Sequence, residues 1–200
     1  MSTMTIAKSE LILGGQKSGK SRRAELLARQ WLDQSPAHRA VLIATAQPWD
    51  DEMRQRIARH QADRAERVPG MTTLEEPLAL AEAIQLHNRP DTLVVVDCLT
   101  LWLTNHLMPA EAVEDTDLEQ NQAGAQVKPV LVAPLLIAIE NAAGPVVLVG
   151  NEIGLGVIPM GREVRAFVDA LGRLNQDVAA ACQRVTLMAA GLPLTLKDSQ

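Results

Sequence analysis

The stretch that decides the fold is Gly14-Gly15-Gln16-Lys17-Ser18-Gly19-Lys20-Ser21, which fits the pattern G-x-x-x-x-G-K-[ST]. Glycine lets such a loop wrap so that its backbone N–H groups point at phosphates. We expect Lys20 to reach the β- and γ-phosphates of a nucleotide, and the Ser21 hydroxyl to hold Mg²⁺ or another divalent cation. An apolar run at 11–13 precedes the loop and a helical pattern begins at 21, so the loop feeds a helix N-terminus. All eight residues are therefore expected nucleotide contacts.

Apolar runs recur on both sides of this loop in the chain. They are continuous and rich in β-branched residues rather than alternating, which is typical of parallel strands buried on both faces. Helical patterns separate them, so the sequence predicts βαβ units with right-handed crossovers. We expect an α/β phosphate-loop NTPase fold with a mostly parallel sheet flanked by helices. The predicted strands lie at 11–13, 41–44, 93–96, 146–149, 185–188 and 194–196, and the helices at 21–32, 50–67, 77–86 and 161–182.

Length and composition indicate one domain over 1–200, at about 150 residues per domain. The net charge of −5 argues against binding nucleic acid through bulk charge. The apolar stretches are far shorter than the roughly 20 residues that a membrane span needs, and residues 1–10 show no secretory signal. Two cysteines cannot form a disulfide framework, so we expect a cytoplasmic protein. Residues 109–128 are acidic and poor in apolar residues, which predicts a surface excursion.

An acidic residue acting on Mg²⁺ should follow another buried strand. Asp97 comes directly after Leu93-Val94-Val95-Val96 and is the candidate for this role. Because Asp also caps helices well, the alternative is that Asp97 is the N-cap of a helix at 99–107. The two roles are compatible.

The predicted helix at 50–67 is mostly charged. His60 recurs at four-residue spacing with Arg56 and Arg64, and Arg59 precedes it. One interpretation is a solvent-exposed helix with ion pairs that contribute little to stability. The other is that the three arginines clamp a polyphosphate and favour a neutral imidazole at His60, which can attack phosphorus as a nucleophile.

Polar residues also follow a strand in the second half of the chain. Asn151 and Glu152 come after the run at 146–149, at the end of the sheet where such folds bind ligands. The alternative is an ordinary strand-to-helix turn. We include both residues, together with Glu76, among the expected nucleotide contacts.

Several linked motifs together resemble one enzyme family. Besides the phosphate loop, they are Ile-Ala-Thr-Ala-Gln (43–47), Asp-Asp-Glu-Met-x-x-Arg-Ile-x-x-His (50–60), Asp-Cys-Leu-Thr-Leu-Trp-Leu-Thr-Asn (97–105), Asn-Glu-Ile-Gly-x-Gly-Val-Ile-Pro (151–159) and Gly-Arg-Leu-Asn-Gln (172–176). The chain resembles the bifunctional adenosylcobinamide kinase/adenosylcobinamide-phosphate guanylyltransferases of cobalamin biosynthesis, in the same order over nearly its whole length.

The resemblance implies a RecA-like fold, a homotrimer and two successive transferase reactions. ATP or GTP would first phosphorylate the aminopropanol hydroxyl of adenosylcobinamide. GTP would then guanylylate a histidine, here His60, which passes GMP to the cobinamide phosphate. Where some members carry two adjacent histidines, this chain has Arg59 and His60, so His60 alone can serve.

Two other functions stay open at the level of sequence. One is a simple small-molecule kinase in which His60 is a surface residue. The other is a non-enzymatic nucleotide-dependent switch, although the chain has no Asn-Lys-x-Asp tetrad for guanine recognition.

Overall fold

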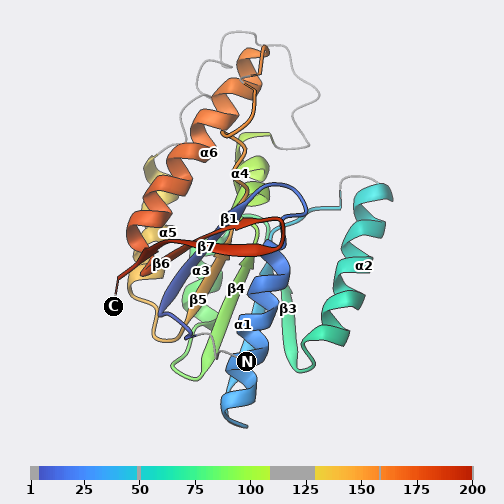
Figure 1. Cartoon of the computed structure of the whole chain (residues 1–200), viewed down its shortest axis with the longest axis vertical. Coiled ribbons are helices and arrows are strands. Elements are labelled where there is room, and N and C mark those ends of the chain that lie inside the picture. Colours follow the sequence, from blue (N-terminus) through green and yellow to red (C-terminus); the bar gives the residue numbers. More distant parts are fainter. Residues whose placement is uncertain (1–4, 49–50, 109–128, 158, 200) are drawn as a thin grey trace.

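The computed structural model describes residues 5–48, 51–108, 129–157 and 159–199. The strands of this part of the chain form one seven-stranded sheet in the order β3-β2-β4-β5-β1-β6-β7 (Figure 1). Their bounds are β1 (Ser9–Gly14), β2 (Arg39–Ala44), β3 (Met71–Glu75), β4 (Thr92–Asp97), β5 (Val146–Val149), β6 (Arg184–Ala189) and β7 (Leu192–Asp198).

Every neighbouring pair of strands is parallel except β6 and β7, which are antiparallel. The expected mostly parallel α/β sheet is thus confirmed. Strands β1, β4 and β5 are buried along nearly their whole length, as continuous β-branched runs predict. One strand, β5, lies between β1 and β4, so the strand that feeds the phosphate loop and the strand that ends on Asp97 are not neighbours. This order agrees with the RecA-like fold that we expected.

Helices cover both faces of the sheet. Since successive strand residues point to opposite faces, Ile12 and Val95 pack with α1, whereas Leu11 and Val94 pack with α3, α4, α5 and α6. The strongly charged α2 stands beside α1 and β3 in Figure 1. The bounds are α1 (Lys20–Gln34), α2 (Asp51–Arg67), α3 (Leu80–His87), α4 (Leu99–Leu107), α5 (Pro129–Glu140) and α6 (Arg162–Ala181).

Three elements differ from the sequence prediction. Strand β3 and helix α5 were not predicted at all. The segment 194–196 was predicted as a strand buried on both faces, and this is wrong: it belongs to β7, whose residues are almost all exposed. The reason is its position, because β7 is the last strand at one edge of the sheet and pairs only with β6.

Among the described residues, no helix is both long enough and apolar enough to cross a membrane. The predicted acidic excursion at 109–128 lies outside the described residues.

Candidate active site

The phosphate loop lies where the sequence predicts it, between the end of β1 at Gly14 and the start of α1 at Lys20. Three of its residues have positive φ: Gly14 at 154°, Lys17 at 54° and Gly19 at 102°. Gly19 is the N-cap residue of α1, so the left-handed turn there delivers the chain into the helix. The loop therefore presents its backbone at the N-terminus of α1.

Lys20 is buried at the head of α1, and its Nζ donates a hydrogen bond to the Gly15 carbonyl at 2.6 Å. Burial lowers the pKa of the Lys20 ammonium, while the negative charge of Asp97 raises it. The lysine of the loop and the acid at the end of β4 thus influence each other electrostatically. This is the pair that the sequence predicts for polarising a phosphoryl group and holding its metal.

Asp97 is the last residue of β4 and is partly exposed at the carboxyl edge of the sheet. In the sheet register it stands opposite Val149 of β5, which in turn stands opposite Ile12 of β1. The N-cap residue of α4 is Cys98, with no side-chain cap hydrogen bond, so capping of this helix by Asp97 is not observed. Its carboxylate is consequently left for another role.

A buried hydrogen-bond network fixes the backbone next to Asp97. The Thr45 hydroxyl donates to the Cys98 carbonyl at 2.7 Å and accepts from the Cys98 N–H at 2.9 Å. The Asn105 side-chain amide donates to the carbonyls of Thr45 at 2.8 Å and of Pro77 at 3.1 Å. Sequence reasoning did not assign a role to Thr45 or Asn105, although both stand inside the quoted motifs. They fix the ends of β2 and β4 relative to each other.

The start of α1 is fixed to the sheet by a buried ion pair. Arg23 of α1 donates a hydrogen bond from its Nε to Glu10 Oε1 of β1 at 3.0 Å, and its Nη2 forms an ion pair with the same oxygen at 2.9 Å. The same Glu10 oxygen accepts from the Thr186 hydroxyl of β6 at 2.8 Å. Breaking a buried pair by removing one partner is costly, so this contact holds the phosphate-loop helix against β1 and β6.

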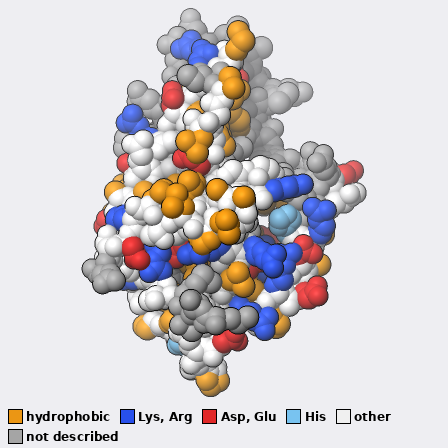
Figure 2. Space-filling model, in the orientation of Figure 1, with side chains coloured by type: hydrophobic (Ala, Val, Ile, Leu, Met, Phe, Trp, Pro, Cys, Tyr) orange, Lys and Arg blue, Asp and Glu red, His pale blue; other side chains and the backbone are white. Residues whose placement is uncertain are grey.

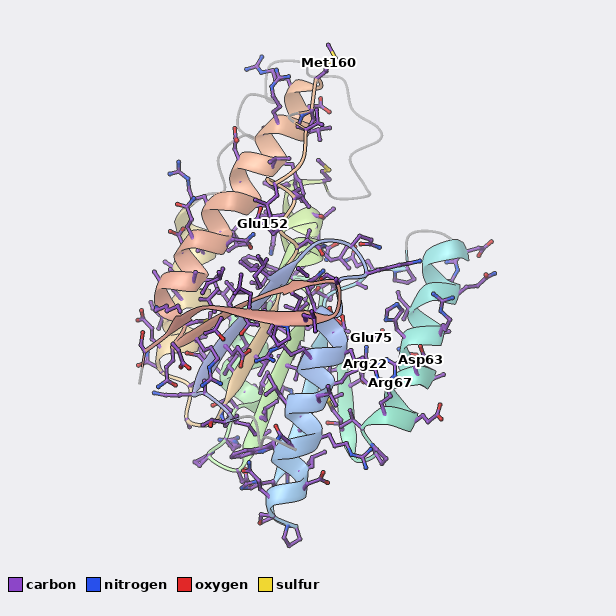
Figure 3. The ribbon with its side chains drawn as sticks, viewed as in Figure 1. Arg22, Asp63, Arg67, Glu75, Glu152 and Met160 are labelled. Atoms are coloured by element: carbon purple, nitrogen blue, oxygen red, sulfur yellow. The ribbon has the colours of Figure 1, made fainter. Side chains whose placement is uncertain are left out.

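Asn151 and Glu152 lie directly after β5, between the phosphate loop and Asp97. The Glu152 N–H donates to the Gly14 carbonyl at 3.1 Å, and the Asn151 N–H to the Thr100 hydroxyl at 2.9 Å. The buried Asn175 of α6 donates to the Asn151 carbonyl at 3.1 Å. Figure 3 shows Glu152 above the strand ends and Met160 at the far end of the segment that leads to α6. These contacts brace the segment against the phosphate loop.

Helix α2 carries His60 and Arg59 as exposed side chains. The structure places Arg64 differently: it is buried, and its Nη1 donates to the Thr73 hydroxyl of β3 at 3.3 Å. The side chain of Arg56 lies outside the described residues, although its backbone belongs to α2. The predicted trio of arginines is therefore divided between the helix surface and its contact with β3.

The C-terminal end of α2 is tied to the rest of the protein. Arg67 donates to Glu25 of α1 at 3.1 Å, and Gln61 donates to Glu75 of β3 at 3.1 Å. Figure 3 shows Arg67 and Asp63 of α2 facing α1, with Arg22 and Glu75 nearby. The hydrogen bond and the charge of Glu25 raise the pKa of Arg67. The interpretation of α2 as a solvent-exposed helix with ion pairs agrees with most of its described residues and with the Arg67–Asp63 pair, but this end of the helix is also tied to α1 and β3.

Glu76, another expected nucleotide contact, lies just after β3. Its Oε1 accepts hydrogen bonds from the N–H groups of Leu78 at 3.0 Å and Ala79 at 2.8 Å. Its carboxylate therefore organises the turn that leads into α3.

Two of the other histidines take part in packing. His38 stacks on Trp31 with ring centroids 3.8 Å apart, and His106 meets the edge of Trp102 at 5.0 Å. For His60, the described residues provide no hydrogen bond, ion pair or ring contact.

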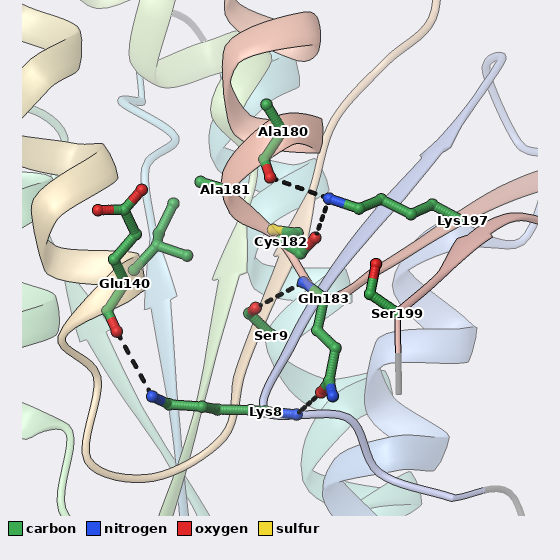
Figure 4. A pocket seen from close by; sticks show the side chains of 10 residues that line it. Lys8, Ser9, Glu140, Ala180, Ala181, Cys182, Gln183, Lys197 and Ser199 are labelled. Atoms are coloured by element: carbon green, nitrogen blue, oxygen red, sulfur yellow. Dashed lines mark hydrogen bonds between the residues drawn. The ribbon is translucent and has the colours of Figure 1, made fainter.

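A pocket of about 410 Å³ lies near the other end of β1 (Figure 4). Its two lysines cap helix ends: Lys197 donates to the carbonyls of Ala179, Ala180 and Cys182 at the end of α6, and Lys8 donates to the Glu140 carbonyl at the end of α5. Lysine at a helix C-terminus satisfies free carbonyls and opposes the helix dipole. This pocket is therefore accounted for by structure and is separate from the phosphate loop.

Comparison with known proteins decides the family. Residues 10–196 match the family model described as "Cobinamide kinase / cobinamide phosphate guanyltransferase". The chain belongs to this family. It is 44% identical over 188 residues to the bifunctional adenosylcobalamin biosynthesis protein CobP of Pseudomonas aeruginosa, covering 94% of this chain and 96% of that protein. It is 36% identical over 187 residues to the bifunctional adenosylcobalamin biosynthesis protein CobU of Escherichia coli, covering 94% of this chain and 98% of the relative.

A solved structure supports the fold of this cobinamide kinase/guanyltransferase family member. The flagellar accessory protein FlaH from Methanocaldococcus jannaschii superposes with a TM-score of 0.51 at 10% identity, over 98% of this chain and 80% of that one. At such low identity the likeness concerns the fold alone.

Proposed function

We propose that this chain carries out both reactions for which its family is named. It would first transfer a phosphoryl group from a nucleoside triphosphate to the aminopropanol hydroxyl of adenosylcobinamide. It would then transfer GMP from GTP, through a guanylylated His60, to the cobinamide phosphate and so form adenosylcobinamide-GDP. The observation that carries the second step is the position of His60 along α2.

Helix direction supports this position. Both α1 and α2 begin at the carboxyl edge of the parallel sheet, since each follows a parallel strand there. Arg67 of α2 meets Glu25 of α1, which lies five residues after Lys20. His60 precedes Arg67 by seven residues, which is two helical turns and about 10 Å toward the start of α2. Residues seven apart share a helix face, so His60 lies on the side of α2 that meets α1, near the level of the phosphate loop.

The chemistry requires a free imidazole near the α-phosphate. A ring nitrogen of neutral His60 attacks the α-phosphorus of GTP, a P–N bond forms, and the bond to the bridging oxygen breaks so that pyrophosphate leaves. A phosphate oxygen of the cobinamide phosphate then attacks the same phosphorus, and the P–N bond breaks to return free imidazole. Lys20 and the loop N–H groups hold the phosphates in both reactions.

A divalent cation fits the oxygen donors at this edge. Mg²⁺ prefers carboxylate, hydroxyl and phosphate oxygens and keeps several waters, so it is usually held by few protein groups. The Ser21 hydroxyl at the first turn of α1 and the Asp97 carboxylate at the end of β4 supply such donors. When bound, Mg²⁺ would neutralise charge on the phosphates.

The other nucleotide contacts follow from the same arrangement. The exposed Arg59 and the Arg56 position one turn before His60 would meet phosphate charge, and Asn151 and Glu152 line the segment between the loop and Asp97. Arg64 and Glu76 act here through positioning, because one is packed against β3 and the other organises the turn before α3. We further propose a homotrimer in the cytoplasm.

Replacing His60 tests the proposal because it separates the two reactions. His60→Asn should abolish guanylyl transfer and leave phosphorylation of adenosylcobinamide within about threefold of the wild-type rate, since an amide cannot form the P–N bond while Lys20, Ser21 and Asp97 remain. His87→Asn, at the end of α3, is the matched control and should leave both rates unchanged. Guanylyl transfer that survives in His60→Asn contradicts the covalent route.

A further inference from the structure

The β6–β7 hairpin contacts the phosphate loop from the side away from Asp97. Its two-residue turn, Ala190-Gly191, has positive φ at both residues, 52° and 79°. The Gly191 N–H donates to the Ser18 carbonyl at 3.0 Å, and a Cβ at Gly19 would lie 3.4 Å from the Gly191 Cα. The hairpin tip is therefore held in direct contact with the loop that grips the phosphates.

The strand order gives the bound nucleotide a direction. From β1, the strand β4 with Asp97 lies two strands away on one side, and β7 lies two strands away on the other, at about 10 Å in each case. Under the proposed function, the terminal phosphate and its metal lie toward Asp97. The α-phosphate and the nucleoside then extend the opposite way, toward the hairpin tip.

The tip presents an apolar side chain at that point. Leu192 is the first residue of β7 and is 70% exposed, although it directly follows the turn that touches the loop. Figure 2 shows hydrophobic side chains gathered over the region of β7. A large exposed apolar side chain beside a ligand site gains free energy when the flat face of a base covers it.

We propose that the tip of the β6–β7 hairpin, and Leu192 in particular, forms the platform on which the nucleobase of the bound nucleotide rests. This inference depends on the proposed function for the orientation of the phosphates. Leucine offers no hydrogen-bonding group, so the platform holds adenine and guanine equally. Such a platform would serve either base, and it leaves discrimination between them to other groups.

The test compares nucleotides with a ligand that has phosphates but no base. GTP, ATP and inorganic tripolyphosphate, each with Mg²⁺, are titrated calorimetrically into His60→Asn, in which no guanylyl transfer is expected, and into the same variant carrying Leu192→Ser. We expect Leu192→Ser to weaken GTP and ATP binding by about fivefold to tenfold and to leave tripolyphosphate binding unchanged.

Leu196→Ser is the matched control. Leu196 is 56% exposed on the same strand, four residues or about 13 Å further from the tip, and its replacement should change none of the three affinities. Unchanged nucleotide binding in Leu192→Ser overturns the proposal, and so does an equal loss for tripolyphosphate. An equal loss in Leu196→Ser, with a smaller mass by light scattering, would assign the strand to a contact between copies of the chain instead. A failure of the His60 route would appear as guanylyl transfer in His60→Asn and would leave these affinity ratios unaffected.

Discussion

Replacing Gly14 by alanine should destabilise the protein strongly, even without any nucleotide. A Cβ at this position would lie 2.5 Å from the Met188 carbonyl oxygen and 2.5 Å from the Ser18 Oγ. The Met188 carbonyl cannot move aside easily, because Gly14 and Met188 are paired in the register of β1 and β6. The backbone of Gly14 also has a φ of 154°, which L side chains rarely adopt.

The expected cost combines two effects. Overpacking of a filled site costs about 1–3 kcal/mol, and a disfavoured backbone conformation costs about 1–3 kcal/mol. The free energy of unfolding should therefore fall by about 2–6 kcal/mol, against a total of about 5–15 kcal/mol for a typical domain. For a chain of this size such a loss lowers Tm by on the order of 10 °C.

The neighbouring glycine of the loop supplies the control. A Cβ at Gly15 meets nothing within 4 Å, so Gly15→Ala should keep its stability or gain a few tenths of a kcal/mol from the lower entropy of the unfolded chain. Urea unfolding and thermal melting of the two variants, without nucleotide, measure the difference. Equal melting temperatures would show that the structure around Gly14 has room for a Cβ.

Three further predictions concern the loop lysine, the thiols and the assembly. Lys20→Ala should lower the rate of adenosylcobinamide phosphorylation by about 10³-fold or more, because a cation at the transferring phosphoryl group is lost; turnover within tenfold of wild type contradicts this. Burial raises the pKa of Cys98 to about 11 and that of Cys182 to about 12, so both thiols stay protonated at pH 8.5 and should resist iodoacetamide in the folded protein but react in urea; rapid labelling of the folded chain would show that they are accessible. Light scattering should give three times the 21.7 kDa chain mass, and a value near that of one chain would exclude the trimer.

The local sequence was sufficient to predict the central strands of the sheet. β1, β4 and β5 lie in the middle of the sheet with both faces covered, so each reads as a continuous apolar run. The phosphate loop is equally local, because its glycines, lysine and serine act within a few residues of one another. In these segments the sequence pattern matches the surroundings of the residues in the fold.

The two elements that were not predicted, β3 and α5, form because of tertiary contacts that their own sequences do not indicate. β3 is an edge strand with a largely exposed Met-Thr-Thr-Leu-Glu sequence, so it lacks an apolar run. α5 is apolar on nearly all sides and has a proline at position 134, so its pattern has no helical period. It packs between α3 and α6, and only that tertiary position explains its composition.

In the candidate site, too, local features could be predicted and tertiary contacts could not. The places of Lys20 at the start of α1 and of Asp97 at the end of β4 could be predicted, because a loop motif and a strand end mark them. The burial of Arg64 against Thr73 could not, because β3 itself was not predicted. The bracing of Asn151 by Asn175 joins residues 24 positions apart in sequence, and that contact exists only once α6 lies against the segment that follows β5.

The covalent role of His60 is tested most directly by the intact mass of the protein after incubation with GTP and Mg²⁺. We expect the addition of one GMP per chain, attached to His60 on peptide mapping, released by mild acid and stable to base, as expected for a phosphorus–nitrogen bond. His87→Asn should acquire the same adduct, and His60→Ala should acquire none. A GMP adduct that persists in His60→Ala, or that survives mild acid, would show that the covalent nucleophile is another residue.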